Sequence, residues 1–299
     1  MYPAPFDYRR PQSVEEAVAD LEVNGARVLA GGHSLLSSLK QRTTAAETLV
    51  DVSELDAIVG VRATDEAIEI GAATTYAAVL NEESVIEAVP MLGDAVSAIG
   101  DPQIRNRGTV GGNLIQADPG ADLPAVALAG DVAIDLVGPT GDRTITIDRL
   151  YAADAVESER GERRVTSAPD ELVTDVRFPK PAGVSEAYCR QTHPATGYAT
   201  IGVAARLGID DDVIISSRIA ASGLTRLPVG LNGVETAIEQ QPIDTAPAVA
   251  GSHAGGQLDA GCIRSDPNVS ASYRRRLLAV VTEEAVTKAI ERATGEDSP

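Results

Sequence analysis

Thr109–Leu123 reads T-V-G-G-N-L-I-Q-A-D-P-G-A-D-L: a hydroxyl and a glycine pair, then an amide side chain, and later a carboxylate before an apolar segment. Glycines let a bulky ligand approach backbone N–H groups closely. Amides for phosphate and a carboxylate for ribose hydroxyls are typical of a nucleotide site. A plain turn explains the same residues, so this stretch alone leaves both interpretations open.

A second glycine pair lies far upstream. Arg27–Ala30 is predicted to be a short buried strand, and Gly31-Gly32-His33-Ser34 follows it directly. Neither pair is followed by the Lys-Ser/Thr of a Walker A loop, and neither fits the G-x-G-x-x-G dinucleotide fingerprint. The sequence therefore predicts a cofactor held by the backbone amides of two separate loops.

Length and residue types limit the possible functions. The 299 residues are enough for two domains, and no apolar run reaches the ~20 residues of a membrane span. The first residues lack the apolar core of a secretory signal, so we expect a cytoplasmic protein. The two cysteines, the three histidines and their spacings fit neither an iron–sulfur cluster nor a metal site, and no catalytic acid/base pair is recognisable.

The formal net charge of −19 makes nucleic acid an unsuitable partner, because phosphate binding needs clustered Lys and Arg. Lysine occurs only at Lys40, Lys180 and Lys288. Such an acidic surface suits a halophile's cytoplasm, where salt screens the self-repulsion. An ordinary acidic protein is the alternative.

The periodicities predict an α+β protein. Ser13 and Glu16 form a capping box for a helix over 13–24, and Pro179 and Pro181 mark a boundary between domains at 1–179 and 183–294. Further helices are predicted at 74–80, 90–99, 123–129, 229–240, 245–251 and 273–294. Strands are predicted at 27–30, 48–52, 57–62, 67–71, 131–137, 143–147, 171–178 and, as a meander, 185–190, 200–207 and 213–221. Residues 151–169 are expected to be a charged loop.

Four motifs together resemble the FAD-binding medium subunit of the molybdenum hydroxylases, the family of carbon monoxide, xanthine and aldehyde dehydrogenases. They are A-G-G-H-S-L at 30–35, G-A-A-T at 71–74, Q-I-R-N-R-G-T-V-G-G-N at 103–113 and A-D-P-G-A-D-L-P-A at 117–125. The resemblance extends over nearly the whole chain. It implies a PCMH-type FAD-binding domain, with FAD between two α+β subdomains, followed by a small C-terminal α+β domain with a three-stranded sheet and helices.

The resemblance also implies which residues bind the cofactor. Asp122 matches a carboxylate near the adenosine ribose, Tyr198 an aromatic residue beside the isoalloxazine ring, and Arg190 a basic position near the flavin. The pyrophosphate would be bound by Ala30, Gly31, Gly32, His33 and Ser34 in the first loop and by Thr109, Val110, Gly111, Gly112 and Asn113 in the second.

The resemblance finally implies a role in electron transfer. A molybdopterin-binding large subunit would oxidise the substrate, and a 2Fe-2S small subunit would pass electrons to FAD on this chain, in a dimer of heterotrimers. Two alternatives remain open: a standalone flavin oxidoreductase with FAD attached covalently to His33, since G-G-H-S also occurs in such oxidases, and a scaffold that kept the fold without FAD.

Overall fold

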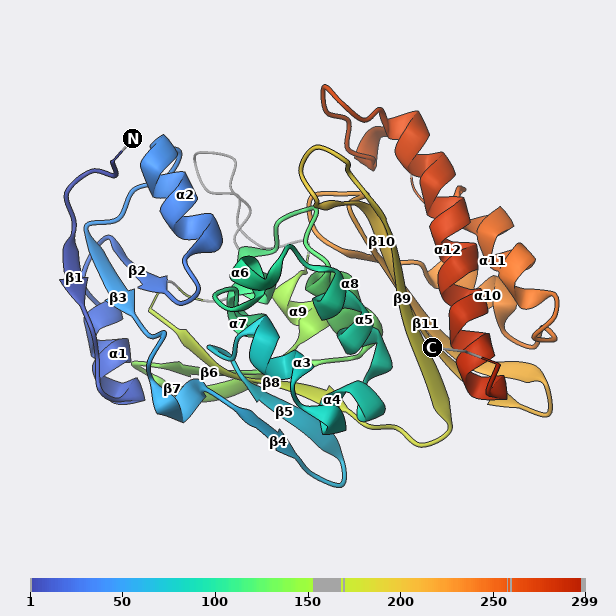
Figure 1. Ribbon diagram of the computed structural model, residues 1–299, viewed down its shortest axis with the longest axis horizontal. Coiled ribbons are helices and arrows are strands. Elements are labelled where there is room, and N and C mark those ends of the chain that lie inside the picture. Colours follow the sequence, from blue (N-terminus) through green and yellow to red (C-terminus); the bar gives the residue numbers. More distant parts are fainter. Residues whose placement is uncertain (1, 153–167, 169, 257, 259, 297–299) are drawn as a thin grey trace. The chain divides into compact units, whose positions relative to one another are not determined.

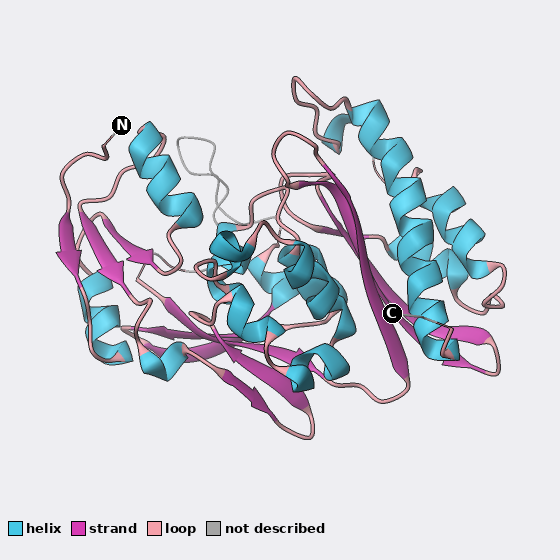
Figure 2. Ribbon diagram, in the orientation of Figure 1, coloured by secondary structure: helices cyan, strands magenta, loops and turns pink. Residues whose placement is uncertain are grey.

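The protein is described by a computed structural model covering residues 2–152, 168, 170–256, 258 and 260–296. It combines helices and sheets (Figures 1 and 2), as the α+β prediction requires. The chain divides into two compact units. Unit 1 contains Met1–Glu82, Gly100–Gln116 and Val132–Phe178, and unit 2 contains Glu83–Ile99, Ala117–Asp131 and Pro179–Pro299. The predicted domain boundary near Pro179 stays a prediction.

The first part of unit 1 is a parallel sheet in the order β1-β3-β2, with β1 Asp7–Arg9, β3 Thr48–Asp51 and β2 Ala26–Leu29. Helix α1 (Val14–Leu21) precedes β2, and its apolar face packs with Val50 and Val52. The predicted N-cap at Ser13 is confirmed, but Glu16 accepts the N–H of Gln12 and not the N-cap N–H of a capping box. Ser13 Oγ accepts the Glu16 N–H at 3.1 Å, and the Glu16 carboxylate accepts the Gln12 N–H at 2.7 Å.

The second sheet of unit 1 has the order β4-β5-β8-β6-β7. Its strands are β4 Val61–Ala63, β5 Ala67–Gly71, β8 Leu172–Pro179, β6 Ala133–Gly138 and β7 Gly141–Thr146. Four short helices accompany it: α3 Tyr76–Leu80, α6 Pro102–Arg105, α7 Val110–Gln116 and α9 Ile147–Leu150. The predicted loop at 151–169 lies mostly outside the described residues.

One strand of this sheet is shorter than predicted. The strand expected over 57–62 is wrong in its first part, where Asp56–Ile58 is a 3₁₀ turn and β4 begins only at Val61. Ile58 is buried, and its carbonyl accepts the Ala73 N–H at 2.9 Å. This segment is therefore hydrogen-bonded to the residues just after β5, but it is not a strand. Gly60, at φ +114°, then redirects the chain into β4.

Unit 2 is built on the predicted meander, which is confirmed. Strands β9 (Val184–Thr192), β10 (Ala199–Asp210) and β11 (Val213–Ser222) pair antiparallel in chain order, and the two-residue β12 (Val229–Gly230) extends the sheet beside β11. Strand β10 is buried along Ala199–Gly208, because helices cover both faces of the sheet (Figure 1). The helices of unit 2 are α4 Glu83–Ala88, α5 Pro90–Ala98, α8 Leu123–Ala129, α10 Asn232–Ile238, α11 Ala246–Ala254 and α12 Ala271–Thr294.

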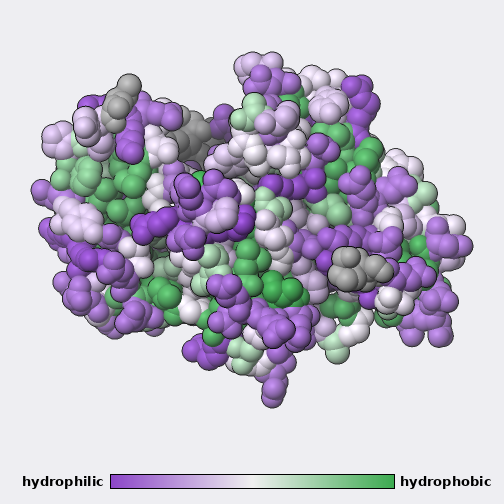
Figure 3. All heavy atoms as spheres, in the orientation of Figure 1, coloured by the Kyte–Doolittle hydropathy of each residue, from purple (hydrophilic) through white to green (hydrophobic). Residues whose placement is uncertain are grey.

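Helix α12 confirms most of its predicted apolar stripe. Leu278, Val281, Ala285 and Ala289 are buried against β9 and β10 together with the residues of α10 and α11. Ala293, also predicted for this stripe, is exposed. Figure 3 shows hydrophilic residues over most of the drawn face, in keeping with the charge of −19. Among the described residues, no helix is both long and apolar enough to span a bilayer.

Candidate functional site

The first glycine pair of unit 1 lies between a strand and a helix. Gly31 has no room for a side chain, since a Cβ there would lie 2.2 Å from the Arg107 carbonyl oxygen. Gly32 has φ +79° and is the N-cap of helix α2 (His33–Gln41), a left-handed position that favours glycine. The sequence did not predict α2.

The N-terminus of α2 has the properties of an anion site. The first N–H groups of an α-helix have no acceptor within the helix, and the helix dipole gives this end a partial positive charge. At α2 no side chain of the described residues caps them. The amides of His33, Ser34 and Leu35, behind a glycine with no side chain, can therefore donate to a phosphate.

The His33 side chain ties the two loops together. Its ring is exposed, and Nε2 lies 3.1 Å from the Ile104 carbonyl oxygen. A carbonyl only accepts, so Nε2 is the donor in this bond. This bond and the contact of Gly31 with Arg107 hold the first loop against the segment that leads into the second.

The second glycine pair is the first turn of α7, a helix that the sequence also did not predict. Val110 N–H donates to the Thr74 carbonyl at 3.1 Å, and Gly111 N–H donates to the Ala72 carbonyl at 2.9 Å. A Cβ on Gly111 would lie 2.6 Å from Ala72 Cβ, so this glycine permits close packing. The N–H groups of Gly112 and Asn113 donate to Thr109, so four of the amides predicted to bind phosphate are already bonded within the protein.

Gly112 differs from its neighbour. It is exposed, and outside its own helix a Cβ there would meet only Thr109 Oγ1 among the described atoms within 4 Å, at 2.6 Å. Thr109 Oγ1 accepts the Gly112 N–H at 3.2 Å. The packing of the chain explains Gly31 and Gly111, and backbone conformation explains Gly32. Gly112 is the position where close approach of a ligand gives the better reason for glycine.

Asn113 completes the second loop and has a partner that the sequence did not indicate. Its Nδ2 donates to the Tyr76 hydroxyl at 2.7 Å. Its Oδ1 is buried and has no hydrogen-bond partner among the described residues. Buried polar atoms are almost always paired, so this oxygen needs an explanation.

Three predicted site residues belong to unit 2. Asp122, the N-cap of α8, is buried; both its oxygens lie 3.0 Å from Arg190 Nη1, and Oδ1 also accepts the Tyr188 hydroxyl at 2.6 Å. Arg190 Nη2 donates to the Ala98 carbonyl. Burial raises the pKa of the Asp122 carboxyl, and the Arg190 charge acts in the opposite direction. Asp122 and Arg190, predicted separately, are one ion pair.

Tyr198 lies at the turn between β9 and β10. Its side chain is half exposed, and its carbonyl accepts the His193 N–H at 2.8 Å. The side chain also lies over Gly120, where a Cβ would be 3.2 Å from Tyr198 Cβ. The D-P-G turn at 118–120 and the G-Y-A-T turn at 197–200 are therefore neighbours within unit 2.

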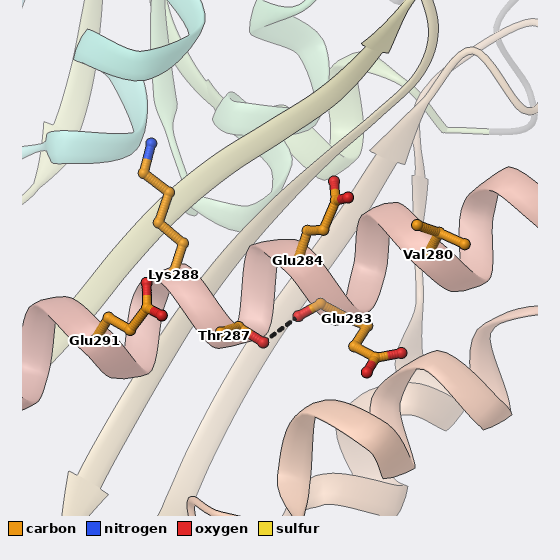
Figure 4. Close-up of a pocket in the computed structure, with 6 residues that line it drawn as sticks. All are labelled: Val280, Glu283, Glu284, Thr287, Lys288 and Glu291. Carbon is orange, nitrogen blue, oxygen red and sulfur yellow. Dashed lines mark hydrogen bonds between the residues drawn. The ribbon is translucent and has the colours of Figure 1, made fainter.

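A shallow groove of about 560 Å³ runs along the exposed side of α12 (Figure 4). It is lined by Val280, Glu283, Glu284, Thr287, Lys288 and Glu291. None of these residues was predicted to bind a cofactor. Lys288 donates to Asp94 at 2.9 Å, so its charge is paired. Among the described residues, no group of three or more His, Cys, Asp or Glu side chains is arranged to hold a metal ion.

The chain belongs to a family of flavoproteins. The family described as "FAD binding domain in molybdopterin dehydrogenase" matches residues 4–181, and the "CO dehydrogenase flavoprotein C-terminal domain" matches residues 186–289. The predicted resemblance, the PCMH-type fold with its C-terminal domain, and FAD as the cofactor are thereby confirmed.

Individual relatives agree with this assignment. The carbon monoxide dehydrogenase medium chain of Afipia carboxidovorans is 33% identical over 98% of this chain and 99% of its own length. The glyceraldehyde dehydrogenase medium chain of Sulfolobus acidocaldarius is 31% identical over 95% and 98%. A chain in a crystal structure of Cu,Mo-CO dehydrogenase is 31% identical, with a TM-score of 0.89 and coverage of 98% and 100%. The chain is thus a FAD-binding medium subunit of the molybdenum hydroxylase type, a component of oxidoreductase complexes.

Proposed function

We propose that this subunit transfers electrons from a partner 2Fe-2S subunit, through FAD, to a final acceptor. The observation that carries the proposal is the uncapped N-terminus of α2, which follows Gly32, in a chain whose residues 4–181 match an FAD-binding family. Bound FAD supplies a carrier that takes up and releases one or two electrons. No residue of this chain is assigned a catalytic role toward the organic substrate.

The residues of unit 1 fit a dinucleotide. The amides of His33 and Ser34 would bind the pyrophosphate, with the α2 dipole favouring its negative charge. Ala30, Gly31, Thr109 and Val110 would shape the backbone around it. Gly112 would allow close approach, and the unpartnered Oδ1 of Asn113 would accept a hydrogen bond from a cofactor hydroxyl.

The roles of the unit 2 residues rest on the resemblance alone. Asp122 has accepted three hydrogen bonds within the protein, which leaves Oδ2 with one lone pair for a ribose hydroxyl. Arg190 Nη1 donates to Asp122 and Nη2 donates to the Ala98 carbonyl, so a contact with the flavin would use Nε or the second N–H of Nη2. Tyr198, half exposed, keeps its ring face available for stacking.

The partners are part of the proposal. The relatives are medium chains, a name that implies a larger and a smaller subunit. We assign these the molybdopterin cofactor and the 2Fe-2S clusters, and we propose a dimer of heterotrimers in the cytoplasm. This chain would hold FAD and exclude water from it, while the chemistry on the substrate would take place in the large subunit.

The test is purification of the native protein followed by a visible absorption spectrum. The proposal expects co-purification with two further subunits and a flavin that acid precipitation releases into the supernatant. A free monomer with full dehydrogenase activity would refute the subunit assignment. Flavin that stays in the acid pellet would support covalent attachment at His33, and a complex that binds no FAD even when FAD is added would support a scaffold.

A further inference from the structure

Tyr76 lies under the second loop and contacts both of its ends. The residue is the first of α3 and is 5% exposed. Its N–H donates to the Gly108 carbonyl at 3.0 Å, and the adjacent residue Thr75 forms a β-bridge with Thr109. These contacts fix the backbone just before the loop begins.

The Tyr76 ring explains why residue 108 is a glycine. A Cβ on Gly108 would lie 2.4 Å from Tyr76 Cε2 and 3.0 Å from Cδ2, so the ring packs directly on the bare backbone. Such close packing leaves the segment entering the loop little freedom to shift. The contact therefore sets the position of the chain two residues before α7 starts.

The Tyr76 hydroxyl fixes the other end of the loop through Asn113, at 2.7 Å. The nitrogen and oxygen of an asparagine amide can be exchanged in such a pair, and Tyr76 would then be the donor. In either orientation one amide atom is held by Tyr76. The other, buried and without a partner among the described residues, remains available for a ligand group.

We infer that Tyr76 is a positioning residue for the FAD site: it holds the segment from Gly108 to Asn113 in the conformation that receives the cofactor, without itself binding FAD. This inference rests on the proposed placement of FAD at the second loop. It assigns a role to a residue outside the two glycine pairs, in the G-A-A-T-T-Y sequence that begins at the last residue of β5.

The matched control is Tyr151. It is also a buried tyrosine of unit 1, and its hydroxyl donates at 3.0 Å to the carbonyl of Leu114, the residue after Asn113. Tyr76→Phe and Tyr151→Phe each remove one hydroxyl that bonds to α7 and keep the ring. Only Tyr76→Phe releases the Asn113 side chain.

The experiment titrates flavin-free protein with FAD, using the chain as purified with any partner subunits. Flavin fluorescence gives the dissociation constant, visible circular dichroism reports how the bound flavin is held, and thermal unfolding gives Tm. Tyr76→Phe should raise the dissociation constant about 3- to 10-fold, the equivalent of one ordinary hydrogen bond, and change the dichroism. Tyr151→Phe also removes one ordinary hydrogen bond, so it should lower Tm. It should leave both flavin readouts at wild-type values.

A double-variant cycle separates positioning from general destabilisation. If Tyr76 acts through Asn113, the effects of Tyr76→Phe and Asn113→Ala on FAD affinity will not add, and the double variant will resemble Asn113→Ala. The inference would be overturned by equal FAD affinity in Tyr76→Phe and Tyr151→Phe, or by fully additive effects of Tyr76→Phe and Asn113→Ala on that affinity. Neither result would contradict the proposed FAD site, because the wild-type protein would still bind FAD. Wild-type protein that binds no FAD would instead overturn the proposed placement of the cofactor.

Discussion

Replacing Gly112 with valine tests the placement of FAD directly. The glycine is exposed, and outside its own helix only Thr109 Oγ1 lies within 4 Å of a Cβ built there, among the described atoms. Its φ is not in the left-handed region, so valine can adopt the backbone conformation. The fold should therefore tolerate the side chain, which would fill the space in front of the second loop.

Two magnitudes follow from these contacts. Displacing Thr109 Oγ1 loses a hydrogen bond like that of a helix cap, about 1 kcal/mol, which lowers Tm by about 2–4 °C in a protein of this size. A valine side chain that displaces the pyrophosphate from its place beside Gly112 would cost at least one of its charge-assisted hydrogen bonds to the His33 and Ser34 amides, about 1.5–3 kcal/mol. The dissociation constant for FAD should then rise roughly 10- to 150-fold.

The assay compares Gly112→Val with Gly111→Val for FAD content, FAD dissociation constant and Tm. At Gly111 a Cβ would lie 2.6 Å from Ala72 Cβ and 2.8 Å from its carbonyl oxygen, so that variant should lose stability first and FAD as a consequence. Gly112→Val should lose FAD with only the fall in Tm of about 2–4 °C worked out above. Wild-type FAD affinity in Gly112→Val would refute the reasoning that puts the cofactor at this loop.

Three further predictions concern stability. Asp94 of α5 accepts hydrogen bonds from Arg292 at 2.8 Å, Lys288 at 2.9 Å and the Tyr188 N–H at 3.0 Å. Asp94→Ala should therefore cost about 2–3 kcal/mol of folding free energy and lower Tm by about 4–10 °C. The control Glu54→Ala removes a largely exposed carboxylate and should change Tm little. Burial alone would raise the pKa of Asp94, but the hydrogen bonds from Arg292 and Lys288 leave it lowered. Its contribution is therefore present above the unfolded pKa of about 3.9 and is lost as pH falls through the lower folded value, so acid unfolding curves of wild type and Asp94→Ala should converge there. With a net charge of −19, the protein should gain Tm as KCl is raised toward molar concentrations, and an unchanged Tm would argue against a halophilic protein.

The elements predictable from the sequence are those whose signals are local. The N-cap at Ser13 needs only four residues, and the meander and α12 show their buried faces in the period of their apolar residues. Helices α2 and α7 lack such signals, since each starts at a glycine pair, and glycine is a poor helix former. Tertiary contacts decide these two: the Arg107 carbonyl against Gly31, and Ala72 against Gly111.

The side-chain pairs of the site could not be read from spacing. Arg190 and Asp122 are separated by 68 residues and Tyr76 and Asn113 by 37, and no periodicity links them. The resemblance implies a separate cofactor contact for Asp122 and for Arg190, and nothing in their spacing indicates that they form one ion pair. Burial forces them together, since a charged carboxylate as deeply buried as Asp122 requires a partner.

The glycine pairs carry a more general lesson about such motifs. A glycine can be required by a ligand, by backbone conformation or by packing, and the sequence letter is the same in each case. Here Gly32 supplies the left-handed N-cap, while Gly31 and Gly111 admit the backbone of another segment. The segment that Gly31 admits, Arg107 and Gly108, leads directly into the loop that contains Gly111. The two loops therefore support each other before any cofactor binds, and this packing by itself requires glycine at positions 31 and 111.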